Sequence, residues 1–139
     1  AHTAIREGEV AINHIVGGSD DRMRYDSVPA VVYMHPEIAG VGATEEKLRA
    51  EGRYYRVLKL PMAYAGRYVV ENEQAPGLCK VLVDENDTIL GCHILGNPAS
   101  ELILLAGIAV TDRSSIEDFR RHIFPHPTAG EILHEVLFS

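Results

Sequence analysis

The residues of this chain best suited to proton transfer form the motif His126-Pro127-Thr128-Ala129-Gly130-Glu131. Histidine titrates closest to neutral pH, and a histidine that moves protons needs its second ring nitrogen held by an acceptor, usually a carboxylate. Glu131 is a candidate acceptor for His126, and Pro127 restricts the backbone of His126 to extended conformations. This spacing is therefore compatible with an acid/base pair.

The same residues also have a purely structural interpretation. Thr128 and Glu131 have the spacing of a capping box, in which the threonine oxygen accepts from the backbone of the glutamate and the glutamate reaches back to the threonine amide. On spacing alone we favour the helix cap over catalysis, because a motif match is only a hypothesis. The two roles are compatible, since a helix start can hold Glu131 where His126 needs it.

Composition limits the classes of function. A chain of 139 residues is long enough for one domain with a sizeable core. A net charge of −7 argues against nucleic acid or an anionic membrane as the main partner. The longest apolar run, residues 102–110, is too short to span a bilayer. The chain begins Ala-His-Thr, and residues 1–17 lack the features of a signal peptide, so we expect a fragment of a longer protein.

The cysteines and the remaining histidines predict neither a disulfide framework nor a metal site. Cys79 and Cys92 lack C-x-x-C spacing, so we expect buried thiols in a reducing compartment, the cytoplasm or, in a eukaryote, the mitochondrial matrix. His122 and His126 are four residues apart, but the prolines on both sides of His126 prevent the single helix face that metal ligation at this spacing uses. We interpret His93 as a packed strand residue and His35 as a turn residue.

Hydrophobic periodicity indicates both helices and strands. Small and apolar residues at steps of three and four predict a helix over residues 1–16, and Gly17 to Asp21 reads as a linker. We expect a strand in a covered sheet at 28–34, a helix from the cap Thr44 to Gly52, strands at 54–60, 78–83 and 88–95, a turn at 74–77, and helices at 98–112 (capped by Asn97), 115–121 and 128–138. Gly40-Val41-Gly42 is not read as a phosphate loop, because carboxylates follow it.

These elements predict an α+β fold with a mixed, largely antiparallel sheet and flanking helices. Consecutive strands without an intervening helix, at 78–83 and 88–95, indicate an antiparallel hairpin. The helix at 98–112 is apolar on nearly every side, so it must be buried on more than one side, against the sheet and against a second subunit.

Several motifs in order resemble one family. Near the end of the chain stands His126-Pro127-Thr128-x-x-Glu131, and upstream lie the segments Met34-His-Pro-Glu-Ile-Ala-Gly-Val-Gly-Ala-Thr-Glu45, Leu60-Pro-Met-Ala-Tyr-Ala-Gly-Arg67, Gly77-Leu-Cys-Lys80 and Ile89-Leu-Gly-Cys-His-Ile-Leu-Gly96. Together they resemble the C-terminal interface domain of the flavoprotein disulfide reductases, and within that family the dihydrolipoamide dehydrogenases. The similarity covers essentially the whole chain. It implies an interface domain at 28–139, a linker at 18–27, and at 1–17 the last helix of an FAD domain missing here.

The resemblance also implies roles for individual residues. His126 would be the acid/base that takes a proton from dihydrolipoamide, and Glu131 would hold its imidazole in the working tautomer. The family places this histidine in the active site of the partner subunit, so His126 and the backbone of Pro127 would lie near the partner's FAD in a homodimer. The full enzyme would pass electrons from dihydrolipoamide, carried by a multienzyme complex, through a disulfide and FAD to NAD. A cis peptide is expected at His126-Pro127, with His35-Pro36 as a second candidate.

The chain also departs from the full family pattern. The family's redox cysteine pair and its glycine-rich FAD and NAD loops have no match here, so this fragment alone is not expected to bind the cofactors fully or to be active. Phe124 stands where many dihydrolipoamide dehydrogenases have a different, polar residue. Glutathione and mercuric reductases share the His-Pro-Thr-x-x-Glu pattern and remain alternatives, as does a non-catalytic dimerisation module in which Thr128 and Glu131 serve only as a cap.

Overall fold

The sheet at the centre of the molecule is antiparallel throughout. A computed structural model describes residues 1–18, 20–73 and 75–139. Within them, five strands pair in the order β1-β2-β5-β4-β3, each antiparallel to its neighbour. The strands are β1 (Ala30–Val32), β2 (Ile38–Gly42), β3 (Arg56–Pro61), β4 (Leu78–Val83) and β5 (Ile89–Leu95). The predicted α+β class is confirmed.

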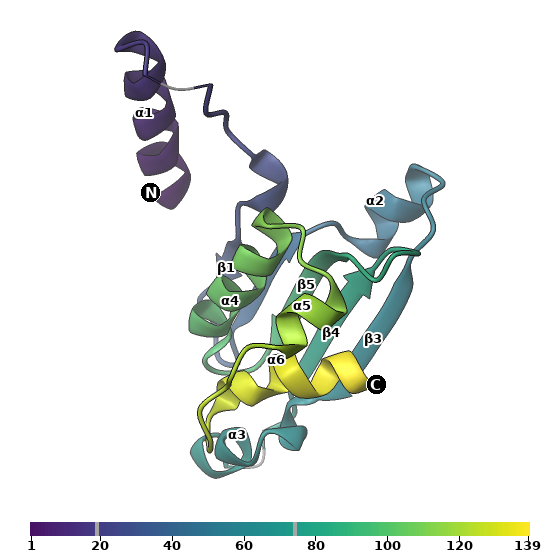
Figure 1. Ribbon diagram of the computed structural model, residues 1–139. Coiled ribbons are helices and arrows are strands. Elements are labelled where there is room, and N and C mark those ends of the chain that lie inside the picture. Colours follow the sequence, from purple (N-terminus) through teal and green to yellow (C-terminus); the bar gives the residue numbers. More distant parts are fainter. Residues whose placement is uncertain (19, 74) are drawn as a thin grey trace.

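The α-helices are α1 (His2–Ile15), α2 (Glu45–Ala50), α3 (Gly66–Glu71), α4 (Ala99–Thr111), α5 (Ile116–Arg120) and α6 (Ile132–Glu135). Helices α4, α5 and α6 cover one face of this sheet (Figure 1). Short 3-10 turns are η1 (Tyr25–Ser27), η2 (Met62–Tyr64), η3 (Ala129–Glu131) and η4 (Val136–Phe138). Helix α4 packs on β2 and β5, and η4 packs on β3 and β4. The predicted final helix at 128–138 is thus a helical segment whose two ends are tightened into 3-10 turns.

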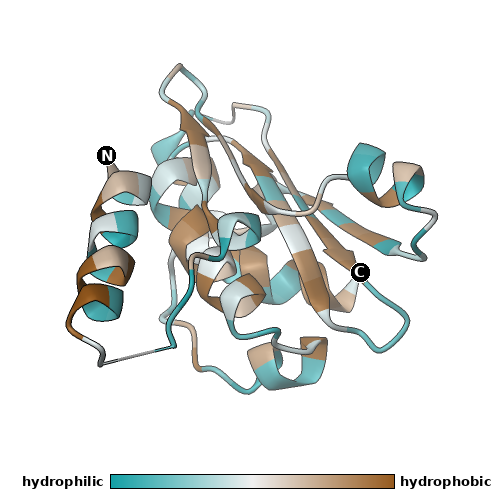
Figure 2. Ribbon diagram, turned by 90° about the horizontal axis from the view of Figure 1, so that it is seen from above, coloured by the Kyte–Doolittle hydropathy of each residue, from teal (hydrophilic) through white to brown (hydrophobic). Residues whose placement is uncertain are grey.

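The core lies between the sheet and this helix layer. The inward residues of the strands and one side of α4 form a single cluster of buried apolar side chains, with Cys79 and Cys92 at 0% exposure on the two central strands. Both thiols are free and buried, as predicted. Apolar strand residues coloured brown in Figure 2 continue the same pattern along the sheet. The other face of the sheet keeps Val32, Ile38 and Val57 exposed at 56%, 43% and 40%.

Two predictions about strands were wrong or incomplete. The strand predicted at 28–34 in a covered sheet is β1, a three-residue edge strand with two exposed residues. Its second edge is unpaired because β2 is its only neighbour in the sheet among the described residues. Strand β2 was not predicted. Glycine is required at position 42, the last residue of β2, because φ is +79 there and a Cβ would meet the Leu90 carbonyl oxygen at 2.3 Å.

The cap of α4 differs from the prediction. Asn97 was expected to cap this helix, but its side-chain oxygen accepts from the backbone N–H of Glu37 at 3.1 Å. The Glu37 carboxylate in turn accepts from the backbone N–H of Ser100 in the first turn of α4, at 2.8 Å. A free backbone N–H at the start of α4 is therefore bonded by the carboxylate of Glu37, more than sixty residues away in sequence, and not by the side chain of Asn97 as expected.

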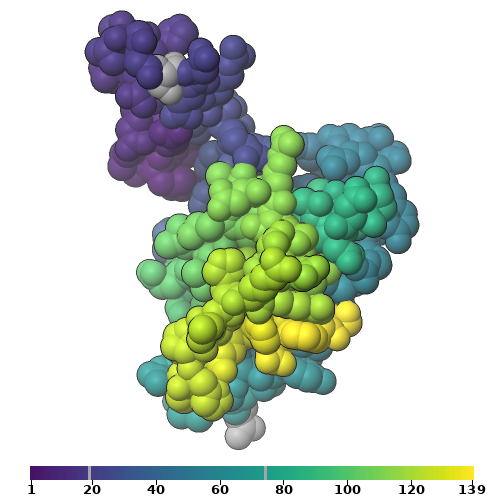
Figure 3. Space-filling model, viewed as in Figure 1, coloured from purple at the N-terminus to yellow at the C-terminus, as the bar shows by residue number. Residues whose placement is uncertain are grey.

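Helix α1 stands apart from the sheet. Every residue of α1 is described and none is buried, and Ile5, Ile12 and Ile15 are exposed at 65%, 59% and 76%. In Figure 3 this purple helix projects from the body of the molecule. The helix was predicted, but its apolar side chains find no cover in this chain. The predicted linker and the turn at 74–77 include residues 19 and 74, which lie outside the described residues. Within the described residues, every helix is too short or too polar to cross a lipid bilayer.

Candidate functional site

His126 and Glu131 form a hydrogen-bonded pair. His126 Nδ1 lies 2.7 Å from Glu131 Oε1, and the His126–Pro127 peptide bond is cis, as expected. The imidazole is 82% exposed while the carboxylate is 22% exposed. An ionised carboxylate only accepts hydrogen bonds, so Nδ1 carries the proton and Nε2 is left with a lone pair that faces away from the pair.

Glu131 is fixed by a second contact. Its other carboxylate oxygen, Oε2, accepts from the backbone N–H of Thr128 at 2.8 Å, and Thr128 and Glu131 form a capping box at the start of η3. The Thr128 hydroxyl donates to the carbonyl of Pro125 at 2.8 Å. The pKa of Glu131 lies below its ordinary value, first because of the Thr128 N–H and then because of His126. The helix cap and the contact with His126 therefore share one carboxylate, with one oxygen in each contact.

The helix start that carries Glu131 is anchored in the core. Ala129 and Ile132 are exposed at only 7% and 0%. Gly130 lies against α4, where a Cβ would be 3.7 Å from Leu102 Cδ2, an ordinary van der Waals distance. Because η3 is packed between the core and α4, the carboxylate of Glu131 has little freedom to move. Rigid support of this kind is what a catalytic carboxylate needs.

An aromatic row supports the segment that leads to His126. The ring of Phe124 lies 5.7 Å from that of Phe119 and 5.4 Å from that of His134, and His134 lies 5.0 Å from Phe138. These tilted pairs have the separations typical of favourable aromatic contacts. Phe124 thereby ties residues 122–125 to α5 and α6. Sequence reasoning noted Phe124 only as a departure, although the aromatics at 119, 124 and 138 were a signal for this packing.

The other histidines are not part of the pair. His122 Nδ1 lies 3.1 Å from the carbonyl oxygen of Phe119, and His134 Nδ1 lies 3.6 Å from Glu135 Oε1. His93 points from the opposite face of the sheet, beside Lys80, and burial followed by the Lys80 charge lowers its pKa. His35 lies at a second cis X-Pro bond, and a third one, not predicted, joins Asn97 to Pro98. In the described part of the chain, no three His, Cys, Asp or Glu side chains gather with metal-binding geometry.

Comparisons with known proteins agree with one another. Residues 28–137 match the family of pyridine nucleotide-disulphide oxidoreductase dimerisation domains. Over its whole length the chain is 46% identical to dihydrolipoyl dehydrogenase 1, mitochondrial, of Arabidopsis thaliana and covers 27% of that protein. It is 39% identical to dihydrolipoyl dehydrogenase 3 of Pseudomonas putida, again over its whole length, and covers 30% of it.

Solved structures give the same picture. The chain superposes on LpdA from Mycobacterium tuberculosis with a TM-score of 0.88 at 25% identity, covering 96% of this chain and 29% of LpdA. The HOCl-induced flavoprotein disulfide reductase RclA from Escherichia coli gives a TM-score of 0.77 at 27% identity, covering 91% of this chain and 30% of RclA. The chain thus spans less than a third of the length of each relative.

Proposed function

Because this chain belongs to the family of pyridine nucleotide-disulphide oxidoreductase dimerisation domains, we propose that it is the interface domain of a dihydrolipoyl dehydrogenase and supplies the acid/base pair His126–Glu131 to the active site of a partner subunit. The observation that carries the proposal is the 2.7 Å contact between His126 Nδ1 and Glu131 Oε1, with the imidazole 82% exposed. A base that serves a second subunit must stand at the surface, and its orienting carboxylate must be held from within its own domain.

In the proposed reaction, His126 Nε2 takes the proton from one thiol of dihydrolipoamide. The resulting thiolate attacks a disulfide outside this chain; a new S–S bond forms, the old one breaks, and a thiolate leaves. The second thiol of the substrate then gives up its proton and attacks the first substrate sulfur in this mixed disulfide. The S–S bond of lipoamide forms, the bond to the protein sulfur breaks, and the protein sulfur leaves as a thiolate, so the protein dithiol is left reduced. Glu131 stabilises the imidazolium that forms and keeps Nε2 free to accept the proton.

Two cofactors complete the proposed activity. When bound in the full-length protein, FAD and NAD would provide the electron acceptors for the reduced dithiol. His126 and Pro127 are both exposed, so their backbone fits an approach to the FAD of a partner subunit. We assign no other residue of this chain to either cofactor. The relatives named as dihydrolipoyl dehydrogenases favour dihydrolipoamide over the substrates of glutathione or mercuric reductases. In the proposal, this substrate is carried by a multienzyme complex in the cytoplasm or the mitochondrial matrix.

Exposed apolar residues support the proposed homodimer. On α4, Leu104 and Ile108 are exposed at 62% and 52%, and the neighbouring Ile123 is exposed at 97%. Exposed apolar side chains gathered in one region mark sites of protein association. Helix α1, with no buried residue, is consistent with the proposal that residues 1–17 close a preceding FAD domain and that 18–27 link it to the interface domain at 28–139.

The function is tested by His126→Gln in the full-length protein. Loss of the proton acceptor should lower the rate of dihydrolipoamide oxidation by about 10²- to 10⁴-fold, the usual contribution of general acid/base catalysis. His122→Gln is the matched control, because the ring of His122 is hydrogen-bonded to the backbone carbonyl of Phe119 in the preceding helix α5. Unchanged turnover in His126→Gln would remove this residue from the chemistry and leave a dimerisation module with a helix cap.

The dimer is tested separately by sedimentation. Leu104→Asp combined with Ile108→Asp places two charges on the exposed side of α4, where they should not disturb the core but should weaken association. Val70→Asp is the control, because Val70 is also exposed, at 80%, but lies on α3. If the double variant remains dimeric at micromolar concentration, the α4 surface is not part of the interface.

A further inference from the structure

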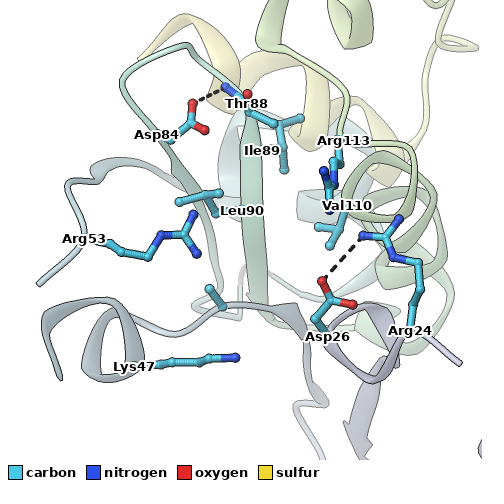
Figure 4. Close-up of a pocket in the computed structure, with 11 residues that line it drawn as sticks. Arg24, Asp26, Lys47, Arg53, Asp84, Thr88, Ile89, Leu90, Val110 and Arg113 are labelled. Carbon is cyan, nitrogen blue, oxygen red and sulfur yellow. Dashed lines mark hydrogen bonds and ion pairs between the residues drawn. The ribbon is translucent and has the colours of Figure 1, made fainter. Parts of the chain in front are cut away.

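A cavity lies at the end of the sheet remote from His126. Its volume is about 470 Å³, and it is bordered by α2, by the segment around η1, by the turn between β4 and β5 and by the end of α4 (Figures 1 and 4). The apolar side chains of Leu90 and Val110 form part of its wall. This volume is within the range of about 300–1,000 Å³ that small-molecule sites occupy.

Positive charge gathers around this cavity from four separate segments. Lys47 comes from α2, Arg53 follows that helix, Arg113 follows α4, and Arg24 precedes η1. Figure 4 shows the charged ends of Lys47, Arg53 and Arg113 bordering the same opening from different sides. A chain whose net charge is −7 would not be expected to collect four cationic side chains in one hollow by composition alone.

The cations are only partly neutralised by neighbouring groups. Arg24 lies 3.5 Å from Asp26, and Arg53 makes a long 3.8 Å contact with Glu51. Neither Lys47 nor Arg113 has an ion pair or side-chain hydrogen bond within the described residues, apart from capping of the Lys47 backbone by Thr44. Two positive charges therefore face the cavity without a partner among the described residues.

Of the two carboxylates that line the cavity, Asp26 and Asp84, the second is hydrogen-bonded to the backbone of its own turn. Asp84 accepts from the backbone N–H groups of Asn86 at 2.9 Å and Thr88 at 2.8 Å, so it stabilises the turn before β5. With four cationic and two anionic side chains around it, the cavity keeps a positive balance. Such a hollow, walled in part by apolar side chains, strengthens the attraction of an anion because the local dielectric is lower than in water.

Arg113 has an unusual backbone conformation. Its φ is +53, in the left-handed region where glycine is the common residue after a helix. The backbone N–H of Ser114 bonds to the carbonyl of Ala109 at 2.9 Å, which completes the helix ending around it. Glycine would be the more stable residue in this backbone conformation. The chain nevertheless has an arginine at this position, and its side chain lines the cavity.

We propose that this cavity binds a small organic polyanion, a phosphate ester or a polycarboxylate. The anionic groups of the ligand would lie among Lys47, Arg53 and Arg113, and its organic part would contact Leu90 and Val110. Arg113 offers the planar donor fork that suits phosphate and carboxylate oxygens, and Lys47 a point charge. This site is independent of the acid/base pair and of the activity proposed for it.

The test is calorimetric titration of the full-length protein with three probes: inorganic phosphate, phenyl phosphate and citrate. Phenyl phosphate should bind more tightly than inorganic phosphate because its ring reaches the apolar wall, and comparison with citrate distinguishes phosphate from carboxylate ligands. Lys47→Met and Arg113→Gly should each weaken the best probe by about tenfold or more, because each removes a charged hydrogen-bond donor. Raising the salt concentration should weaken binding further.

Two features of the variants keep the result decisive. Lys47 and Arg113 are exposed, and glycine suits the backbone at position 113, so both variants should fold. Lys59→Met is the matched control, because Lys59 is an exposed lysine of β3 that does not line the cavity. If no probe binds, or if the control weakens binding as much as the two variants, the cavity is not a polyanion site.

Discussion

Glu131→Gln separates the two roles of the carboxylate. Glutamine serves in a capping box as well as glutamate does, so the start of η3 should survive the change. Glu131, however, accepts two hydrogen bonds, from His126 Nδ1 at 2.7 Å and from the Thr128 N–H at 2.8 Å, one on each oxygen. A glutamine side chain has only one acceptor oxygen and an amide group that donates. One of the two contacts must therefore change.

The geometry indicates which contact changes. If the amide oxygen stayed with His126, the side-chain NH₂ would face the Thr128 N–H, and the two donors would meet in a half-buried site. That arrangement should be rarer by about ten- to a hundredfold, because it leaves a backbone donor unpaired. The favoured arrangement gives the oxygen to Thr128 and the NH₂ to His126 Nδ1. The imidazole must then carry its proton on Nε2, so that Nε2 can no longer accept a proton from the substrate.

The expected loss follows from the tautomer. A wrong tautomer together with the lost carboxylate charge should lower turnover of dihydrolipoamide by about 10²- to 10⁴-fold, comparable to the effect of the corresponding Asp→Asn change in serine protease triads. Heteronuclear NMR of the imidazole nitrogens should show the proton moving from Nδ1 to Nε2. Glu117→Gln, an exposed glutamate of α5, is the control for loss of charge. Turnover within about threefold of wild type, or an unchanged tautomer, would refute the reasoning.

Two further predictions concern the scaffold. The Lys80 ammonium, together with other donors, lowers the pKa of Glu45 from 4.5 to about 2. A lowered carboxyl pKa adds stability that is fully present above pH 4.5 and is lost as the pH falls towards 2. Lys80→Met should therefore flatten the acid dependence of the unfolding free energy in that window and raise the NMR titration midpoint of Glu45. Gly91→Ala should lower the free energy of unfolding in urea by about 1–3 kcal/mol, because the new Cβ would lie 2.3 Å from the carbonyl oxygen of Ala43. Gly66→Ala, with open space around its Cβ, should be neutral or stabilising. Equal urea midpoints for the two variants would contradict this packing argument.

Local signals in the sequence were sufficient for much of the fold. The hairpin of β4 and β5, the cap Thr44 on α2 and the capping box at Thr128 were predicted, because each depends on residues within a few positions of one another. For the same reason the six-residue stretch from His126 to Glu131 could be singled out before its geometry was known.

The errors occurred where structure depends on distant residues. Strand β2 holds three glycine or alanine residues and is a strand because β5 pairs with it along five positions. The cap of α4 comes from Glu37, so no pattern around Asn97 could reveal it. The cavity beside Lys47 and Arg113 also unites residues from four segments, and in sequence these cations look like ordinary surface charges.

The two buried thiols give the central strands an internal reporter. Cys79 and Cys92 lie on the paired strands β4 and β5 with no exposed surface, and the neighbouring Cys79, followed by burial, raises the pKa of Cys92 well above its ordinary value. A water-soluble thiol reagent can reach them only while β4 and β5 are open, so the labelling rate counts those openings. The rate at which the reagent modifies these two native cysteines can therefore rank ligands, partner subunits and amino-acid changes by how strongly they keep the sheet closed.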